Sequence, residues 1–529
     1  MLSSFCALGL ALFVTHSHGH NNPIAIPTPG KHSQPVERDL SSFSIEFSFF
    51  PHYAGNRSHP NKFSEHLLEN FQQITGVYPR VRVGGTSQDK SNYYPDQEEG
   101  IKLTYANPTD DQPSEIKYGP AFFESYHTLG NVKFSHGLNM NQNASLHQLQ
   151  LAAVEACTSI GPQLDIYELG NEWNFSGDEY RLANYSLLDY VNEWNKKSAF
   201  VKAAVQKACP GPFPGFMAPS FVFVDGMTTW TAEELYNLDY DPHDLTKEIS
   251  FHNYMGVFAP PLAPVSYDLQ KTLMNHTNIV DNLALQIQRM NNLAYLGHPY
   301  ILGETNSIAN QGRNGESNVF GDALWVVDFS LWAATNVGTP YPYQTTIIRQ
   351  LITRGTQNIK RLNFHQGLDY RYASWQPIAS EGQPPTTRPP YYGHIMVAAS
   401  LGHSENIRIV NIPLEEDTES AYGIYNDDKL SKLVVVNLNA FNQSTTTGRP
   451  SRKYEFKVPG HYKRATVERL IAPGSDALTN ITFGGVSYDY DFKQGRPVTL
   501  DWKEERAGIH SNMLQIDVPD SSAVLLSLD

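Results

Sequence analysis

Between about residues 42 and 404, short apolar runs alternate with longer amphipathic segments. This alternation is typical of βα units arranged around a parallel sheet. The apolar runs predict strands at residues 44–50, 81–84, 132–135, 165–169, 216–219, 249–253, 300–303 and 362–365. These are eight strands, the number that closes a (β/α)8 TIM barrel.

The segments between these strands predict helices. Residues 187–208, 282–293 and 320–335 have apolar positions with helical spacing, and we expect their apolar faces to pack on the barrel. Residues 375–390 contain five prolines, which predicts an irregular loop after the last strand, close to the mouth of the barrel.

After residue 404 the pattern changes to short alternating segments separated by Gly, Pro and Asn turns. These segments are residues 407–411, 420–426, 432–439, 453–458, 465–470 and 523–528. The pattern predicts an antiparallel β-sandwich. We therefore expect a catalytic barrel at 20–403, whose first residues can add a strand to the β-domain, and a C-terminal β-sandwich domain at 404–529.

The N-terminus predicts secretion. Residues 5–14 form an apolar run that is too short to span a bilayer, and residues 1–19 read as a signal peptide. Glycosylation sequons occur at Asn56, Asn143, Asn174, Asn184, Asn275, Asn442 and Asn480. Such acceptors matter only in the secretory pathway, so we expect an extracellular glycoprotein. Asn174 is expected to be unmodified, because it lies two residues after a candidate catalytic glutamate.

Charge and cysteine content exclude several classes of ligand. The net charge of −15 argues against nucleic acid or an anionic membrane as a partner. Removal of a signal peptide leaves Cys157 and Cys209, which can pair in an oxidising compartment or remain free thiols. Their spacing does not predict a zinc site. We expect no metal and no cofactor, and the sequence favours no particular oligomeric state.

Two glutamates stand where a parallel barrel keeps its chemistry. Glu172 follows the fourth predicted strand, and Glu304 follows the seventh. Strand ends of a TIM barrel face one common mouth, so the two carboxyl groups can meet there. A retaining glycosidase needs such a pair, one as acid/base and one as nucleophile, about 5–5.5 Å apart. Asn171 lies beside Glu172, and its amide can bind a sugar 2-hydroxyl.

Three runs resemble glycoside hydrolase family 79, which contains β-glucuronidases and heparanases. They are LGNE at residues 169–172, LGETNS at 302–307 and RVGGT at 82–86. The resemblance covers most of the chain and implies a retaining β-glucuronidase on a (β/α)8 barrel. It implies Glu172 as acid/base and Glu304 as nucleophile.

The same resemblance suggests further substrate-binding residues. FHNY at residues 251–254 is similar to the family's aromatic His-x-Tyr segment, which implies that Tyr254 binds the nucleophile or the sugar and that His252 lines the pocket. A core histidine is the competing interpretation of His252. Tyr372 resembles a tyrosine that contacts the glucuronate carboxylate, with backbone amides of residues 308–312, Arg371 or Arg313 as other candidates.

The predicted function is hydrolysis of terminal β-linked glucuronic acid, or its 4-O-methyl ether, from glycans. The acidic composition disfavours the basic cleft of heparanase-like members. Two alternatives stay open: a retaining β-glycosidase of the same barrel clan that acts on a neutral sugar, and a carbohydrate-binding protein without catalysis. Aryl glycosides of different sugars separate the first, and measurable hydrolysis excludes the second.

Overall fold

The structure is a computed structural model. It describes residues 18–19, 23–31, 33–108, 110, 112–141, 144–175, 184–222, 230–257, 268–335, 358–501 and 503–529. The predicted signal peptide lies outside these ranges except for its last two residues. The sequon residue Asn143 also lies outside them.

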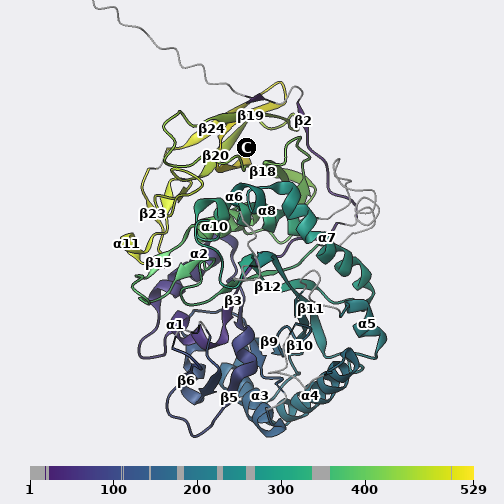
Figure 1. Cartoon of the computed structure of the whole chain (residues 1–529). Helices are drawn as coiled ribbons and strands as arrows, with labels where there is room; N and C mark the ends of the chain where they lie inside the picture. The colour runs from purple at the N-terminus through teal and green to yellow at the C-terminus, as the bar shows by residue number, and fades with distance from the viewer. Residues whose placement is uncertain are drawn as a thin grey trace, which may run out of the picture.

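Eight parallel strands close into a barrel, which confirms the predicted fold class (Figure 1). In order around the barrel they are β3 (Ser41–Glu46), β4 (Val81–Gly84), β8 (Phe134–Leu138), β9 (Leu164–Leu169), β10 (Phe216–Val222), β11 (Thr246–Val257), β12 (Tyr300–Ala309) and β13 (Leu362–Gln366). Each predicted strand overlaps one of them. Ile166, Met217 and Ile301 form a separate buried apolar cluster from β9, β10 and β12.

The first predicted strand is wrong beyond Glu46. Residues Phe47–Phe49 form the 3-10 helix η1, and Phe50–Ala54 form helix α1. Pro51 falls in the first turn of α1, where its missing N–H is tolerated. The rings of Phe47 and Phe122 stack at 4.8 Å, so the apolar run is buried without being a strand. Periodicity alone does not separate these two outcomes in a short apolar run.

Helices surround the barrel. The main ones are α2 (Lys62–Thr75), α3 (Leu146–Ile160), α4 (Leu187–Ala208), α5 (Ala232–Asn237), α7 (His276–Asn292), α8 (Phe320–Ala334) and α10 (Pro389–Leu401). Helix α4 has the predicted bounds, and its start is fixed by a capping box between Ser186 and Asp189. A disulfide joins Cys157 on α3 to Cys209 at the C-cap of α4.

Helix α8 lies between the barrel and the C-terminal sheet (Figure 1). Every residue of this helix is buried. Its Asp328 accepts hydrogen bonds from His276 on α7 and from Tyr422 in the C-terminal sheet. The two parts of the chain are therefore joined by a continuous core and by buried polar contacts.

The proline-rich segment is only partly irregular. Its strands β14 (Trp375–Gln376) and β15 (Thr386–Thr387) pair antiparallel, and Pro389 opens α10. The prediction of a loop through residue 390 is thus wrong at its end. Proline is well suited to the first helical turn, where no N–H is needed for the helix.

The C-terminal strands form one mostly antiparallel sheet. They are β16 (Ile407–Asn411), β17 (Glu419–Asn426), β18 (Lys429–Asn437), β19 (Ser451–Lys457), β20 (Arg464–Ile471), β24 (Glu505–His510), β25 (Met513–Pro519) and β26 (Ser522–Leu528). Apolar residues of β19 and β25 share one core with those of β17, β18 and β26, so the sheet covers itself. The sequence analysis missed β24 and β25.

Smaller elements complete the fold. A three-stranded sheet of β5 (Ser91–Tyr93), β6 (Ile101–Thr104) and β7 (Glu115–Tyr118) is inserted after β4. Strands β1 (His18–Gly19) and β2 (Ile24–Ala25) pair with β19 of the C-terminal sheet. Within the described ranges, no helix is both long and apolar enough to cross a bilayer.

Candidate active site

Glu172 lies three residues beyond the end of β9. Its backbone has φ of 52°, a left-handed conformation that is uncommon for a residue other than glycine. The Glu172 N–H donates to the carbonyl oxygen of Ser220 at 2.9 Å, and the Glu172 carbonyl accepts from the N–H of Phe175 at 2.8 Å. These bonds hold the strained residue in place, as is common at functional sites.

Glu304 lies within β12 and does not end it, because the strand continues to Ala309. The pairing with β11 shifts at this point: Phe251 pairs with Leu302, but His252 pairs with Glu304. Gly303 is therefore the extra residue of a β-bulge. A Cβ atom at Gly303 would lie 2.0 Å from the Ser250 Oγ and 2.7 Å from the Met217 Cε, so glycine leaves room for these two side chains. The bulge re-aims Glu304 into the barrel mouth.

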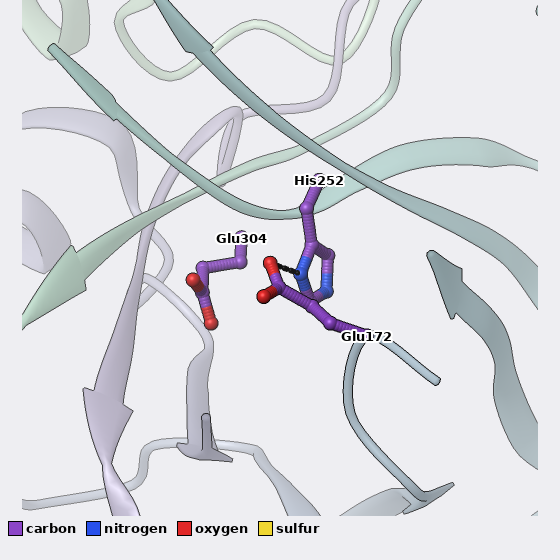
Figure 2. Close-up of side chains that lie close together, drawn as sticks. All are labelled: Glu172, His252 and Glu304. Atoms are coloured by element: carbon purple, nitrogen blue, oxygen red, sulfur yellow. Dashed lines mark hydrogen bonds and ion pairs between the residues drawn. The ribbon is translucent and has the colours of Figure 1, made fainter. Parts of the chain in front are cut away.

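The two carboxyl groups meet over that mouth, as predicted (Figure 2). One ligand atom each of Glu172, His252 and Glu304 lies within 4.8 Å of the others. The nearest approach of the two carboxylates is thus within 4.8 Å. A nearest approach of this size is compatible with the carboxyl separation of about 5–5.5 Å in retaining glycosidases.

Glu304 is surrounded by hydrogen-bond donors and positive charge. Its Oε1 accepts from the Tyr254 hydroxyl at 2.6 Å, and its Oε2 accepts from the Arg82 Nη1 at 2.5 Å. The His365 Nδ1 lies 3.6 Å from the same Oε2. Burial alone would raise the pKa of Glu304, but the charges of His365, His252 and Arg82 lower it well below its ordinary value. Glu304 is therefore a carboxylate at neutral pH.

Glu172 has the opposite electrostatic environment. Burial raises the pKa of the Glu172 carboxyl, and the nearby charge of Glu304 raises it further, against the hydrogen bond from His252. That bond joins the His252 Nδ1 to the Glu172 Oε1 at 2.8 Å (Figure 2). Two neighbouring carboxyls with pKa values shifted in opposite directions are suited to separate acid and base roles.

Arg82 connects the parts of the site from beneath. Its guanidinium is fully buried and bonds the Glu168 Oε2 at 2.7 Å, the Ser44 Oγ at 2.9 Å and the Asn171 Oδ1 at 2.6 Å, in addition to Glu304. A Cβ atom at Gly84 would lie 2.8 Å from both the Arg82 Nε and the Glu168 Oε2. The first glycine of the RVGGT run thus leaves room for this ion pair.

Asn171 is fixed on both its backbone and its side chain. Its N–H donates to the Asp89 Oδ2 at 2.8 Å, and its Oδ1 accepts from Arg82. Asp89 also accepts from the Met140 N–H at 2.6 Å. Burial raises the pKa of Asp89 to about 7, against these two backbone bonds. With its Oδ1 held by Arg82, the Asn171 amide has its Nδ2 as the remaining donor.

Tyr372 also reaches the site, beside Tyr254. The centroids of these two rings are 6.3 Å apart, and Tyr372 is buried. The N–H of Arg371 donates to the Gln311 carbonyl at 2.7 Å, which holds the segment after β12 against the Tyr372 segment. The Arg371 side chain is exposed, and Arg313 pairs with Glu316 at 3.0 Å.

Sequence analysis missed three contributors to the site. It assigned no role to Arg82, although this residue opens the quoted RVGGT run. It also missed Glu46 and His365, whose side chains pair at 3.1 Å at the ends of β3 and β13. Their position at the carboxyl ends of barrel strands was the available signal. For His252, the bond to Glu172 places it in the site, although its full burial also matches the competing core interpretation.

Glu172, His252 and Glu304 are the group in the described ranges whose ligand atoms are close enough together to hold a metal ion. Their chemistry does not require one. Arg82 already neutralises Glu304, and His252 already bonds Glu172.

Comparisons with known proteins find a family model and two relatives that match this chain. The model of the glycosyl hydrolase family 79 C-terminal beta domain matches residues 421–525. A beta-glucuronidase of Aspergillus niger is 39% identical, with 96% of this chain and 93% of that protein covered. A beta-glucuronidase of Neurospora crassa is 34% identical, with 88% of each chain covered.

A solved structure also has the same fold. It is a 4-O-α-L-rhamnosyl-β-D-glucuronidase from Fusarium oxysporum 12S in complex with Rha-GlcA, with a TM-score of 0.74 and 22% identity. The match covers 96% of this chain and all of that one.

Proposed function

Because the chain belongs to glycoside hydrolase family 79, we propose that it is a retaining β-glucuronidase that removes terminal β-linked glucuronic acid, or its 4-O-methyl ether, from glycans. The observation that carries this proposal is the pair Glu172 and Glu304. One oxygen of each lies within 4.8 Å of one oxygen of the other, and their pKa values are shifted in opposite directions. The two relatives named beta-glucuronidases support the choice of sugar.

In the first step, an oxygen of Glu304 attacks the anomeric carbon of the glucuronide. The bond from that carbon to the leaving oxygen breaks, and Glu172 gives its proton to the leaving oxygen. The raised pKa of Glu172 favours this protonated form, and the lowered pKa of Glu304 keeps the nucleophile charged. The product of the step is a glucuronyl ester of Glu304.

In the second step, Glu172 is a carboxylate and takes a proton from water. The water oxygen attacks the anomeric carbon, the ester bond to Glu304 breaks, and glucuronic acid leaves with its original β configuration. Proton transfer returns Glu172 to its acidic form. Two inversions at one carbon thus give net retention.

The neighbouring residues have positioning and binding roles in this proposal. Tyr254 and Arg82 orient the Glu304 carboxylate through the bonds at 2.6 and 2.5 Å, and His252 orients Glu172. The Asn171 Nδ2 is the donor for the sugar 2-hydroxyl. Tyr372 contacts the glucuronate carboxylate, a role suggested by its place beside Tyr254.

We also propose that the enzyme is secreted. The apolar run at residues 5–14 and the sequons support this location. The disulfide between Cys157 and Cys209 supports it as well, because such bonds persist in oxidising compartments. The Asn174 side chain is buried and bonds the backbone of Val222 through both of its polar atoms, which supports the expectation that this sequon is unmodified.

The decisive test compares 4-nitrophenyl β-D-glucuronide with the matching β-glucoside and β-xyloside. We expect the native enzyme to prefer the glucuronide, and a preference for a neutral sugar would establish the alternative activity. Glu304→Gln should reduce kcat at least about 10⁴-fold, because it removes the carboxylate proposed to attack the anomeric carbon. Glu304→Ala with azide should yield the α-glucuronyl azide, since azide then attacks in a single inverting displacement.

A matched variant separates the two roles. Glu172→Ala retains the nucleophile, so azide intercepts the glucuronyl enzyme and should give the β-glucuronyl azide. The same azide anomer from both variants, or full activity of Glu304→Gln, would refute the assignment.

A further inference from the structure

Asp89 is a buried acid beside the site that takes no part in the two proposed steps. It lies in the 3-10 helix η2 (Thr86–Lys90), three residues after the end of the RVGGT run. Burial raises its pKa to about 7, so the fold disfavours the charged form of this group. A carboxyl group that is costly to bury and lies next to a catalytic pair suggests a role in the function of that pair.

Two backbone donors converge on this carboxyl group. The Met140 N–H donates to the Asp89 Oδ1 at 2.6 Å, and the Asn171 N–H donates to the Asp89 Oδ2 at 2.8 Å. One side chain thus joins the segments that follow β4, β8 and β9. A carboxylate offers an acceptor oxygen to each donor, whereas an amide has one oxygen and would turn its own N–H groups toward the second donor.

The segment after β8 is held independently of Asp89. The Met140 carbonyl accepts from the Lys197 Nζ at 2.6 Å, and this ammonium group also pairs with the Glu193 Oε1 at 2.6 Å. The Asn139 Nδ2 donates to the carbonyl of Ser91 at 2.8 Å. The Met140 N–H is therefore a fixed point from which Asp89 can position other groups.

The turn that follows β9 packs directly on this segment. Gly170 has φ of 80°, and its N–H donates to the Leu138 carbonyl at 3.1 Å. A Cβ atom at Gly170 would lie 3.0 Å from the Met140 Cβ and 2.6 Å from the Trp173 ring. The two segments are in close contact, and the bonds to Asp89 fix them relative to each other.

We propose that Asp89 is a positioning residue for the contact with the sugar 2-hydroxyl. This inference rests on the proposed function, in which the Asn171 Nδ2 donates to that hydroxyl. Asp89 holds the Asn171 backbone and Arg82 holds its Oδ1, so together they set the direction of the Nδ2. The contact strengthens in the transition state, so a misplaced Nδ2 should lower kcat and leave KM nearly unchanged.

The test combines a variant of the full chain with two substrates. They are 4-nitrophenyl β-D-glucuronide and its 2-deoxy analogue, which lacks the hydroxyl. Asp89→Asn should lower kcat about 10- to 100-fold on the glucuronide and less than about threefold on the analogue. Asn171→Ala should show the same dependence on the hydroxyl. A variant that merely unfolds more readily loses the same fraction of its activity on both substrates, so a structural role alone does not produce this pattern.

Asp165→Asn is the matched control. It is the same substitution at the start of β9, where Asp165 pairs with Arg80 at the opposite end of the barrel. It should behave as the native enzyme on both substrates. Asp89→Glu is used if Asp89→Asn does not fold. It retains both acceptor oxygens, but its additional methylene should displace Asn171 and give a smaller loss with the same dependence on the hydroxyl.

Native kcat in Asp89→Asn, or equal losses on both substrates in the Asp89 variant that folds, would overturn the inference and leave the proposed function in place. A native enzyme that does not hydrolyse the nitrophenyl glucuronide would refute the proposed function, and the positioning role with it.

Discussion

The two ends of the barrel each place an arginine among carboxylates, yet the two arginines differ in burial. Arg80 immediately precedes β4 and pairs with Asp39 at 2.8 Å, with Asp165, and with Glu248 at 4.0 Å. Arg82, two residues later, pairs with Glu168 and Glu304. The Arg80 side chain is 32% exposed, whereas that of Arg82 is fully buried.

This difference explains why similar charges can have different roles. At the Arg80 end, the ion pairs are partly open to water, which screens them, so each contributes less than a fully buried pair. At the Arg82 end, burial strengthens every interaction and makes an unpaired charge costly. His365, His252 and Arg82 together hold Glu304 charged there, against the effect of burial. The network around Arg80 therefore joins strands, and the network around Arg82 sets the protonation of the proposed nucleophile.

Replacing one glutamate by glutamine at each end of the barrel should give the largest difference in activity. Glu172→Gln removes the proposed proton donor, so kcat/KM on a glycan substrate should fall about 10²–10⁴-fold. The loss should be much smaller on 2,4-dinitrophenyl β-glucuronide, whose leaving group needs no proton. Glu248→Gln, at the Arg80 end, should leave kcat unchanged. Equal losses on both substrates would contradict the acid role of Glu172.

Removing the buried arginine should have the next largest effect. Arg82→Met leaves Glu168 and Glu304 buried without their partner, so we expect a loss of about 3–5 kcal/mol in the free energy of unfolding. Misplacement of Glu304 should also lower kcat by about 10²–10³-fold. Urea denaturation and steady-state kinetics measure the two effects.

Arg82→Lys is a second variant, for the case that Arg82→Met does not fold. It retains the charge but cannot bond Glu168, Glu304 and Asn171 together. A folded Arg82→Lys enzyme with native kcat would show that the fork of bonds does not position the nucleophile.

A histidine–carboxylate pair at each end allows a finer comparison. His252 bonds Glu172, and His298, two residues before β12, bonds Asp244 at 2.9 Å. The His252 bond lowers the pKa of Glu172. Glu172 must be protonated to act as the acid, so activity falls as the pH rises through its pKa. His252→Ala should raise that pKa and move the alkaline limb of kcat/KM to higher pH. His298→Ala should leave the limb in place.

The sequence predicted the barrel and both carboxyls because these depend on local signals. An apolar run followed by a glutamate is visible in one strand, as at Leu302 and Glu304. The network around Arg82 is different, because its partners come from β3, β9 and β12 and meet only when the barrel closes. The bulge at Gly303 is also invisible without the pairing register of two strands.

Other misses have equally physical causes. Residues 47–50 are as apolar as a strand, so their sequence does not distinguish a strand from a helical turn. In the fold, the helical turn is buried by packing against Phe122. Strand β24 has Glu505, Arg506 and His510 and only one buried position, so it lacks the apolar alternation of a strand, whereas β25 does alternate, with Leu514, Ile516 and Val518 as its buried positions. His365 belongs to a correctly predicted strand, but its role depends on Glu46 and Glu304, which lie far away in the sequence.

Removing the partly exposed arginine, Arg80, should have the smallest effect. Arg80→Met removes ion pairs to three carboxylates, but the site is partly open to water, so the free energy of unfolding should fall by only about 1 kcal/mol. High salt should reduce the difference in the free energy of unfolding between Arg80→Met and the native protein, because salt screens the same ion pairs in the native protein. The pH profile and kcat should match the native enzyme, because Arg80 contacts neither Glu172 nor Glu304. A change in kcat at unchanged stability would mean that charge at the Arg80 end affects the catalytic groups at the Arg82 end. Burial alone would then not explain why the two arginines have different roles.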